Sequence, residues 1–333
     1  MDTKKHMLPS DLKRKRFIKV QATTNTHYGK SPSDRTINEL LHNGMMILDK
    51  PSGPTSHQVV AWIKNILDIT NVGHGGTLDP NPTGVLPVAF GDGTHALQSL
   101  LHSGKEYITL MKLHKACNET TITETVSQFV GEIYQVPPLR SAVKRRRRKR
   151  HIYYLDILEI KNTEVLFKVG CESGTYVRTL CVDIGKKLGC KAHMQDLRRT
   201  RVGSLIEQKA ATLQDLKDAY VFFTEDNEEK ELRKIIQPAE QLLVDLPKIV
   251  VRDSAVDALC HGANLAVPGV IELDAGITHN DLTAIMTQKG EGVALAHSKL
   301  SSEQILEKDT GICAELVRVL MKKGTYPSIW KKS

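Results

Sequence analysis

The chain has 333 residues, 40% of them hydrophobic and 25% charged, a composition typical of an ordinary globular protein long enough for two domains. No apolar run approaches the ~20 residues that cross a bilayer, and the polar N-terminus lacks the apolar core of a signal peptide, so we expect neither a membrane protein nor an exported one. The six scattered cysteines contain no Cys-x-x-Cys pair, which argues against zinc binding and a disulfide framework, and the net charge of +8 favours a polyanionic partner.

The predicted elements combine strands with separate helices. Residues 1–40 are polar, basic and weakly periodic, so we expect an extended arm rather than a domain. Apolar spacing then predicts strands at 44–48, 107–113, 152–160 and 164–171, and helices at 57–67 (with Ser56 as its N-cap), 94–101, 176–188, 212–223 and 228–236. This mixture predicts an α+β domain over residues 41–240, built around a mixed, largely antiparallel sheet.

The pattern breaks between Pro238 and Pro247. Beyond this break, residues 252–270 predict a short helix, a glycine turn and a strand, and three further apolar runs follow. We therefore expect a second, smaller domain over residues 247–333.

The segment 73–86, Gly-His-Gly-Gly-Thr-Leu-Asp-Pro-Asn-Pro-Thr-Gly-Val-Leu, contains a single carboxylate in a constrained backbone. Its glycines allow a tight turn or the close approach of another backbone, and Pro80 pushes Asp79 toward an extended conformation. A carboxylate held in this way suits a nucleophile or a general base. From the local pattern alone, an Asp-Pro turn beside a buried strand is an equally good interpretation.

A dense basic run follows residues 137–139 and precedes the strand predicted at 152–160. It consists of Lys144, Arg145, Arg146, Arg147, Arg148, Lys149 and Arg150. Adjacent like charges repel one another and need a polyanion or solvent nearby. A nuclear-localisation signal or a solvated loop is an alternative, but the position of the run between predicted elements favours contact with nucleic acid.

Four segments together resemble one family. Residues 73–86 resemble the catalytic motif of the pseudouridine synthases that include the bacterial tRNA uridine-55 enzyme and the dyskerin family, and the resemblance makes Asp79 the essential catalytic residue. Residues 48–57 resemble the first motif of that family, residues 105–107 its substrate-stacking motif, and residues 174–180 its third motif. The resemblance implies the pseudouridine synthase fold and the isomerisation of uridine in RNA, a reaction that needs no metal, nucleotide or redox cofactor.

The same resemblance assigns the other residues of the catalytic centre. It makes Arg178 the partner of Asp79, Tyr107 the residue that stacks on the flipped base, and Tyr176 a second tyrosine near the base. It also places Leu180 in the apolar wall of the pocket and His74 near the RNA. Without the resemblance, Arg178 would be an exposed helix charge and Tyr107 a half-buried strand residue.

Two further parts of the resemblance concern structure and binding. Lys50 and Pro51 in the first motif are expected to brace the catalytic loop. The C-terminal region resembles a PUA domain, a small β-barrel that binds RNA, and there Gly262 and Ala263 are the expected RNA contacts.

The details favour the dyskerin branch, and the compact length is typical of an archaeal member. Residues 115–135 are too short for the inserted loop by which the bacterial enzymes recognise tRNA, whereas the arm, the basic run and the C-terminal domain resemble the dyskerin branch. That resemblance implies the catalytic subunit of an H/ACA ribonucleoprotein with a guide RNA and a target RNA (rRNA, and in some cases tRNA). Its protein partners are a small zinc-ribbon-like protein, a small β-barrel protein and a kink-turn-binding ribosomal protein. The expected location is the cytoplasm of an archaeon, or the nucleolus of a eukaryote.

Two alternatives stay open at this point. A stand-alone tRNA uridine-55 synthase would use the same chemistry without a guide. An RNA-binding assembly scaffold would retain the architecture while catalysis became secondary.

Overall fold

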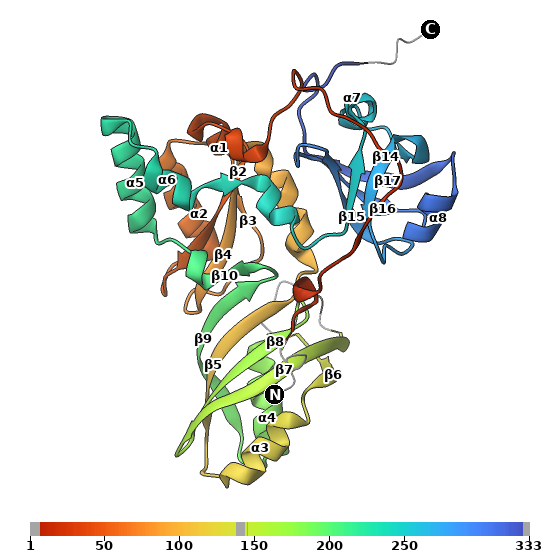
Figure 1. Ribbon diagram of the computed structural model, residues 1–333. Helices are drawn as coiled ribbons and strands as arrows, with labels where there is room; N and C mark the ends of the chain where they lie inside the picture. The colour runs from red at the N-terminus through yellow and green to blue at the C-terminus, as the bar shows by residue number, and fades with distance from the viewer. Residues whose placement is uncertain (1–6, 138–143, 145, 329–333) are drawn as a thin grey trace.

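The computed structural model describes residues 7–137, 144 and 146–328. Arg145, which belongs to the basic run, lies outside the described residues, as do the ends of the predicted arm and of the C-terminal domain. Two β-sheets organise the described chain, and helices pack on both (Figure 1).

The larger sheet carries the region that we expect to be catalytic. Its strands are β2 (Gly44–Lys50), β3 (Val72–His74), β4 (Thr83–Phe90), β5 (Lys105–Leu113), β6 (Gly131–Gln135), β7 (Arg148–Lys161), β8 (Glu164–Cys171), β9 (Ala192–Val202), β10 (Leu205–Ile206) and β11 (Gln237–Pro238). They run in the order β11-β2-β4-β9-β5-β8-β7-β6, with β3 beside β4 and β10 beside β9. The pairing of β4 with β9 is parallel and the other described pairings in this sheet are antiparallel, which confirms the predicted mixed, largely antiparallel sheet.

The helices cover the sheets where their apolar sides meet the core. The α-helices are α1 (Ile37–His42), α2 (Ser56–Leu67), α3 (Glu119–Ser127), α4 (Val177–Lys187), α5 (Leu213–Asp226), α6 (Lys230–Ile235), α7 (Asp253–Cys260) and α8 (Ser302–Glu307). The 3-10 helices are η1 (Pro9–Asp11), η2 (Pro32–Asp34), η3 (Gly91–Leu101), η4 (Glu207–Lys209), η5 (Ala239–Leu243) and η6 (Val267–Gly269).

The predicted strands and helices of the catalytic region are all present, with ends shifted by up to four residues. The segment expected as a helix at 94–101 is the 3-10 helix η3, which begins at Gly91. Helix α2 begins one residue earlier than predicted, because Thr55 rather than Ser56 is its N-cap and accepts a hydrogen bond from the backbone N–H of Gln58. Ser56 lies inside the first turn and is completely buried.

The larger sheet has two halves, one around β2 and β4 and the other around β5, β7 and β8, and each half packs against its own apolar cluster. One cluster packs α2 and α5 against β2 and β4, with Val59, Ile63 and Leu216 completely buried. Another packs α3 and α4 against β5, β7 and β8. The junction of the two halves, where β4 meets β9, is therefore a rigid place to build a site.

The smaller sheet belongs to the C-terminal region and includes a strand from the arm. Its strands are β1 (Arg16–Ile18), β12 (Lys248–Val251), β13 (Leu265–Ala266), β14 (Val270–Asp274), β15 (Leu282–Thr287), β16 (Gly292–Ser298) and β17 (Ile312–Val319). They run in the order β1-β14-β12-β15-β16-β17-β13. A further apolar cluster, which contains Met45 and Leu242 together with Val250 and Leu295, joins this sheet to the larger one.

The arm is extended, as predicted, but it is bound along much of its length. Strand β1 pairs antiparallel with β14, and Thr24 donates a hydrogen bond to the carboxylate of Asp253. The red segment in Figure 1 accordingly runs beside the blue C-terminal region. Helix α1 begins at Ile37, within the residues assigned to the arm.

Candidate active site

The carboxylate of Asp79 lies on a loop between β3 and β4 whose backbone is hydrogen-bonded by the buried side chains of Lys50 and Ser56. The ammonium group of Lys50 is completely buried and donates hydrogen bonds to the carbonyl oxygens of Pro51, Pro80 and Pro82, at 2.8, 2.8 and 3.0 Å. Burial lowers the pKa of Lys50, as does the nearby charge of Arg199. The ammonium group thus connects the part of the loop after Asp79 to Pro51, which contributes only its carbonyl oxygen.

A second contact fixes the other side of the loop. The hydroxyl of Ser56 donates to the carbonyl of Leu78 and accepts from its N–H, both at 2.9 Å. Because Ser56 begins α2, the helix and the catalytic loop form one unit. Asp79 therefore projects from a backbone that is tied down on both sides.

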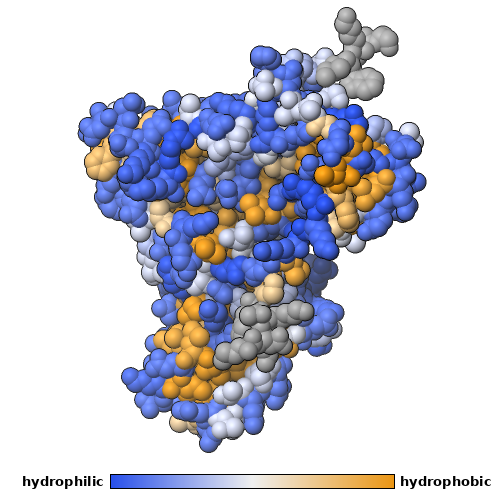
Figure 2. Space-filling view, viewed as in Figure 1, coloured by the Kyte–Doolittle hydropathy of each residue, from blue (hydrophilic) through white to orange (hydrophobic). Residues whose placement is uncertain are grey.

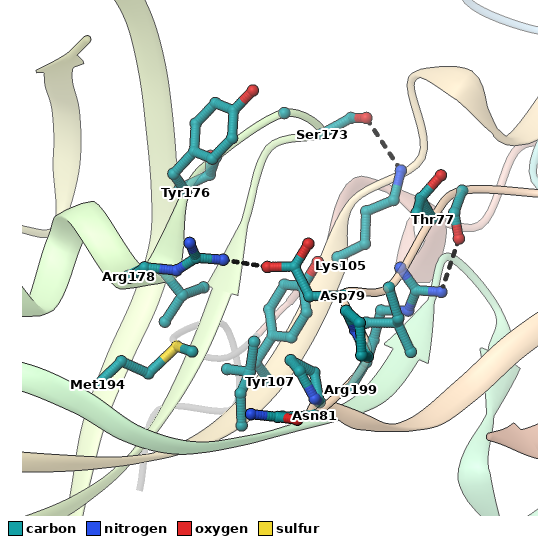
Figure 3. A pocket seen from close by; sticks show the side chains of 18 of the residues that line it. Thr77, Asp79, Asn81, Lys105, Tyr107, Ser173, Tyr176, Arg178, Met194 and Arg199 are labelled. Atoms are coloured by element: carbon teal, nitrogen blue, oxygen red, sulfur yellow. Dashed lines mark hydrogen bonds and ion pairs between the residues drawn. The ribbon is translucent and has the colours of Figure 1, made fainter. Parts of the chain in front are cut away.

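Asp79 and Arg178 form an ion pair, although 99 residues separate them in the sequence (Figure 3). Arg178 lies in the first turn of α4, and its guanidinium points across the cavity to the loop. The pair is not buried, since the side chains of Asp79 and Arg178 are 54% and 47% exposed. The pair lies at the rim of an open cavity, where a substrate can reach it.

The cavity has a volume of about 940 Å³ and lies at the junction of the two halves of the larger sheet. Asp79, Tyr107, Tyr176 and Arg178 all line it. Its apolar wall comes from η3, α4 and β9, and consists of Leu97, Leu100, Leu101, Val177, Met194 and Leu197. The volume and the mixture of apolar wall with a few charged groups suit a flat heterocycle on a charged backbone.

Tyr107 lies on β5 with its side chain toward this cavity (Figure 3). Burial raises the pKa of its phenol, which therefore stays protonated at neutral pH. Tyr176 is the N-cap residue of α4, and the amide side chain of Gln135 both donates to its carbonyl and accepts from its N–H. Both tyrosines thus approach the place where a base would lie.

Leu180 does not line the cavity. Its side chain is completely buried in the cluster beneath α4, because it faces the sheet rather than the opening. Leu197, on β9, supplies the apolar surface instead. Sequence reasoning missed Leu197 because it follows no helical stripe; the only available signal was its place next to the Arg198-Arg199-Thr200-Arg201 cluster.

His74 also lies outside the lining of the cavity. It ends β3, and its ring packs edge-on against His57 with 5.1 Å between ring centroids. Burial lowers the pKa of His74, and the neighbouring His57 and Arg199 lower it further, so the ring is neutral at pH 7. The ring of His74 therefore contacts His57 and is not part of the cavity lining.

The described part of the basic run divides into two kinds of residue. Strand β7 begins at Arg148, four residues earlier than predicted, so that the end of the run pairs with β6. Lys149 forms an ion pair with Glu132, and Arg150 lies 3.8 Å from the carboxylate of Glu172. Lys144 and Arg146 precede the strand and belong to no ion pair that the structure describes. The run is therefore only in part a free loop.

In the C-terminal region, Gly262 and Ala263 lie in the exposed turn after α7. Gly262 has a φ of +92°, and no atom lies within 4 Å of the position that a Cβ would take. The turn is thus open to a partner, as an RNA contact requires.

Comparison with known proteins follows the same division of the chain. Models of the TruB family match residues 64–177 (TruB family pseudouridylate synthase, N-terminal domain) and 178–244 (tRNA pseudouridylate synthase B, C-terminal domain). A DKCLD domain matches residues 5–60 and a PUA domain residues 247–320. A protein of Methanosarcina mazei named "Probable tRNA pseudouridine synthase B" is 52% identical over 98% of this chain and 96% of its own length.

The chain belongs to the TruB family of pseudouridine synthases. A protein of Pyrococcus furiosus, also named "Probable tRNA pseudouridine synthase B", is 50% identical over 99% of this chain and 98% of its own length. This TruB-family enzyme isomerises uridine in RNA, and its fold is the predicted pseudouridine synthase fold with a C-terminal PUA domain. The boundaries 1–40, 41–240 and 247–333 remain predictions.

Solved structures show the same architecture. A chain of "Crystal Structure of a Cbf5-Nop10-Gar1 Complex" matches with a TM-score of 0.94 and 51% identity, over 96% of this chain and 98% of its own. A chain of "Structure of H/ACA RNP bound to a substrate RNA containing 2'-deoxyuridine" matches with a TM-score of 0.92 and 48% identity, over 98% of this chain and 100% of its own. In the part of the chain that the structure describes, none of the helices is long and apolar enough to span a membrane.

Proposed function

We propose that this TruB-family enzyme is the RNA-guided catalytic subunit of an H/ACA ribonucleoprotein. The observation that carries the proposal is the match of the whole chain, arm and PUA domain included, to chains solved in H/ACA complexes, with TM-scores of 0.94 and 0.92. The arm supports it as well, because β1 completes the C-terminal sheet and ties the expected RNA-binding domain to the catalytic one.

In this proposal Asp79 is the catalytic carboxylate, and Arg178 holds it. Arginine suits the second role, since its planar guanidinium keeps its charge and directs its N–H groups at a carboxylate. The open position of the pair leaves the Asp79 carboxylate accessible to a ribose or a base. The isomerisation breaks the N1–C1′ glycosidic bond of uridine and forms a C5–C1′ bond, while C5 loses a proton and N1 gains one, so that product and substrate have the same composition.

The target uridine has to leave its RNA stack to reach Asp79. Flipping a base costs a few kcal/mol, whereas stacking it on an aromatic ring returns about 1–3 kcal/mol. Tyr107 offers such a ring on the wall of the cavity, and Leu197 adds apolar surface to the lining. Tyr176 at the N-terminus of α4 is the second tyrosine that would contact the base.

The protein partners follow from the same comparison. The related chain was solved together with Nop10 and Gar1, and we infer that this chain binds two proteins of that kind. Apolar residues gather in patches among the charged ones on the face shown in Figure 2, which is typical of surfaces that other proteins cover. A kink-turn-binding ribosomal protein would join through the guide RNA.

A reconstitution experiment tests guidance. The purified chain is mixed with a guide RNA, its two small partners and a target RNA that pairs with the guide, and pseudouridine is measured in the target. We expect product only at the uridine that the guide leaves unpaired. Product at the same site without the guide would contradict the proposal.

A second candidate function has its own support. Curated relatives at 50–52% identity carry the name "Probable tRNA pseudouridine synthase B". Transcribed tRNA without guide or partners is therefore the second substrate in the experiment. Turnover of tRNA alone, at a rate at least equal to that of guided turnover, would favour the stand-alone enzyme.

An Asp79→Asn variant separates catalysis from assembly. We expect no product while the affinity for guide RNA stays within a few-fold of wild type, because Asn keeps the shape and loses the charge. The control is Asp196→Asn, which changes another carboxylate on the wall of the cavity. Retained turnover in Asp79→Asn would remove Asp79 from the mechanism and leave the scaffold hypothesis in its place.

The basic run is a proposed RNA contact. Removing one side chain that binds a phosphate should lower the slope of log affinity against log salt by about 0.7 for a single strand. Replacing Lys144 and Arg146 by Gln should therefore lower it by about 1.4. Replacing Lys149, which pairs with Glu132, should change the slope less. Equal slopes in all variants would mean that the run faces solvent.

A further inference from the structure

Arg199 is a buried cation to which the proposed mechanism gives no role. It lies on β9, its residue is 2% exposed, and its side chain reaches the floor of the cavity (Figure 3). Burial lowers the pKa of its guanidinium, and the phenol of Tyr107 opposes that shift. A charge in such a place is costly unless it does something for the fold or the reaction.

The contacts of Arg199 bracket the catalytic loop. Its Nε donates to the carbonyl of Val85 at 2.7 Å, and one terminal N–H donates to the carbonyl of Gly76 at 3.0 Å. Gly76 precedes Asp79 and Val85 follows it, so one rigid guanidinium connects the two ends of the loop. Lys50 braces the middle of the same loop at Pro80 and Pro82.

A third contact joins the loop to the stacking residue. Tyr107 is the cross-strand neighbour of Arg199 between β5 and β9, and both residues line the cavity. On the other edge of β9, Gly84 pairs with Arg199 through the backbone. Arg199 is thus the point where the start of the loop, its end and the stacking ring meet.

The neighbouring arginines show that this arrangement is particular to Arg199. Arg198 pairs with Asp49 and Glu207, and Arg201 pairs with Asp11. Arg199 takes part in none of the ion pairs found among the described residues. Its hydrogen-bond partners among the described residues are two carbonyls, and a guanidinium can reach both because its N–H groups lie in one plane.

We propose that Arg199 is a positioning residue for the reaction, which holds the Asp79 loop and the ring of Tyr107 at a fixed separation. The base stacked on Tyr107 would then lie at a constant distance from the Asp79 carboxylate. Misplacing reacting groups by about 1 Å can slow a reaction about 100-fold, so such a link affects rate more than binding. The inference rests on the roles proposed above for Asp79 and Tyr107.

The test compares single-turnover rates of the assembled enzyme with whichever RNA the wild type modifies. For Arg199→Met we expect a rate about 100-fold below wild type, with RNA affinity within 3-fold. Arg199→Lys, which keeps the charge but cannot reach both carbonyls at once, should recover part of the rate. Arg198→Met is the matched control, since it removes an arginine from the next position of β9 outside the cavity lining, and its rate should stay within 3-fold of wild type.

A double variant tests the link to the phenol. Tyr107→Phe keeps the ring and removes the hydroxyl. If Arg199 acts partly through that hydroxyl, adding Tyr107→Phe to Arg199→Met should slow the reaction less than it slows the wild type. Strictly multiplicative effects would overturn this link.

The outcome that would overturn the proposal is a rate for Arg199→Met within 3-fold of wild type in folded protein, with any loss confined to the melting temperature. That result would leave Arg199 a purely structural residue. A failure of guidance shows in the wild type, as product without a guide, whereas a failure of this proposal shows only in the ratio of variant to wild-type rates. The two failures are therefore distinguishable.

Discussion

Replacing Lys50 by Met should destabilise the protein by about 2 kcal/mol, because the variant leaves the carbonyl of Pro82, a buried residue, without a donor. Lys50 is completely buried and donates to three carbonyls. Pro80 keeps a second donor, the N–H of Gly53, so the oxygens that the substitution leaves without a described donor are those of Pro51 and Pro82. Each unsatisfied buried acceptor costs about 1–3 kcal/mol, and the apolar Met side chain offsets part of that loss.

Urea unfolding at pH 7, followed by circular dichroism, measures this difference. Lys112→Met is the control, since Lys112 forms an ion pair with Glu164 in which both side chains are more than a third exposed. An exposed pair of this kind contributes about 0–1 kcal/mol. If Lys50→Met and Lys112→Met both stayed within 1 kcal/mol of wild type, the bracing of the loop by Lys50 would be refuted.

Three further predictions concern backbone space, pH and the arm. A Cβ on Gly84, whose φ is +101°, would lie 2.2 Å from the carbonyl oxygen of Arg199, so Gly84→Ala should lower the free energy of unfolding by more than about 3 kcal/mol. The control Gly131→Ala, with φ +99° and free space for a Cβ, should lower it by about 1–2 kcal/mol. Thermal unfolding compares the two variants, and equal losses would show that the close approach at Gly84 is unimportant. Burial lowers the pKa of Lys105 from 10.5 to about 8, so folding disfavours its charged form. The free energy of unfolding of the wild type, relative to Lys105→Met, should therefore rise between pH 8 and pH 10.5 by at most about 3 kcal/mol. A difference between the two proteins that stays constant over that pH range would contradict the shift. Arg35 forms two hydrogen bonds of 2.7 Å with Glu240, and both side chains are nearly buried. Arg35→Met should therefore lower the free energy of unfolding in urea by about 3 kcal/mol. A loss below about 1 kcal/mol would mean that other contacts hold the arm.

The parts of the fold that local pattern determines were predictable. Helix α2 lies where predicted to within one residue, since Val59, Ile63 and Leu67 follow a helical spacing and become its buried stripe. The short strand β3 and the 3-10 geometry of η3 were missed, because neither has enough residues or a strong enough period to be recognised without tertiary contacts.

The candidate site was predictable only where a motif could be matched. Asp79 and Arg178 do meet, but sequence could not tell that the pair is open to solvent, because exposure depends on how α4 stands against the loop. Leu180 was misplaced, since a helical stripe marks the residues that face the core and not those that face a cavity. The role of Arg199 was not predicted, because β9 was not recognised as a strand and only its position in the sheet buries the guanidinium under the loop.

The pairing of β1 with β14 has a consequence for biosynthesis. Ile18 faces Glu272 across that pairing, so the ribosome has to make more than two hundred residues between one strand and its neighbour. At roughly 5–20 residues per second the early segment waits roughly 10–50 s for its partner. During that interval the basic arm of the nascent chain is accessible to RNA, because the strand that pairs with it has not yet been made.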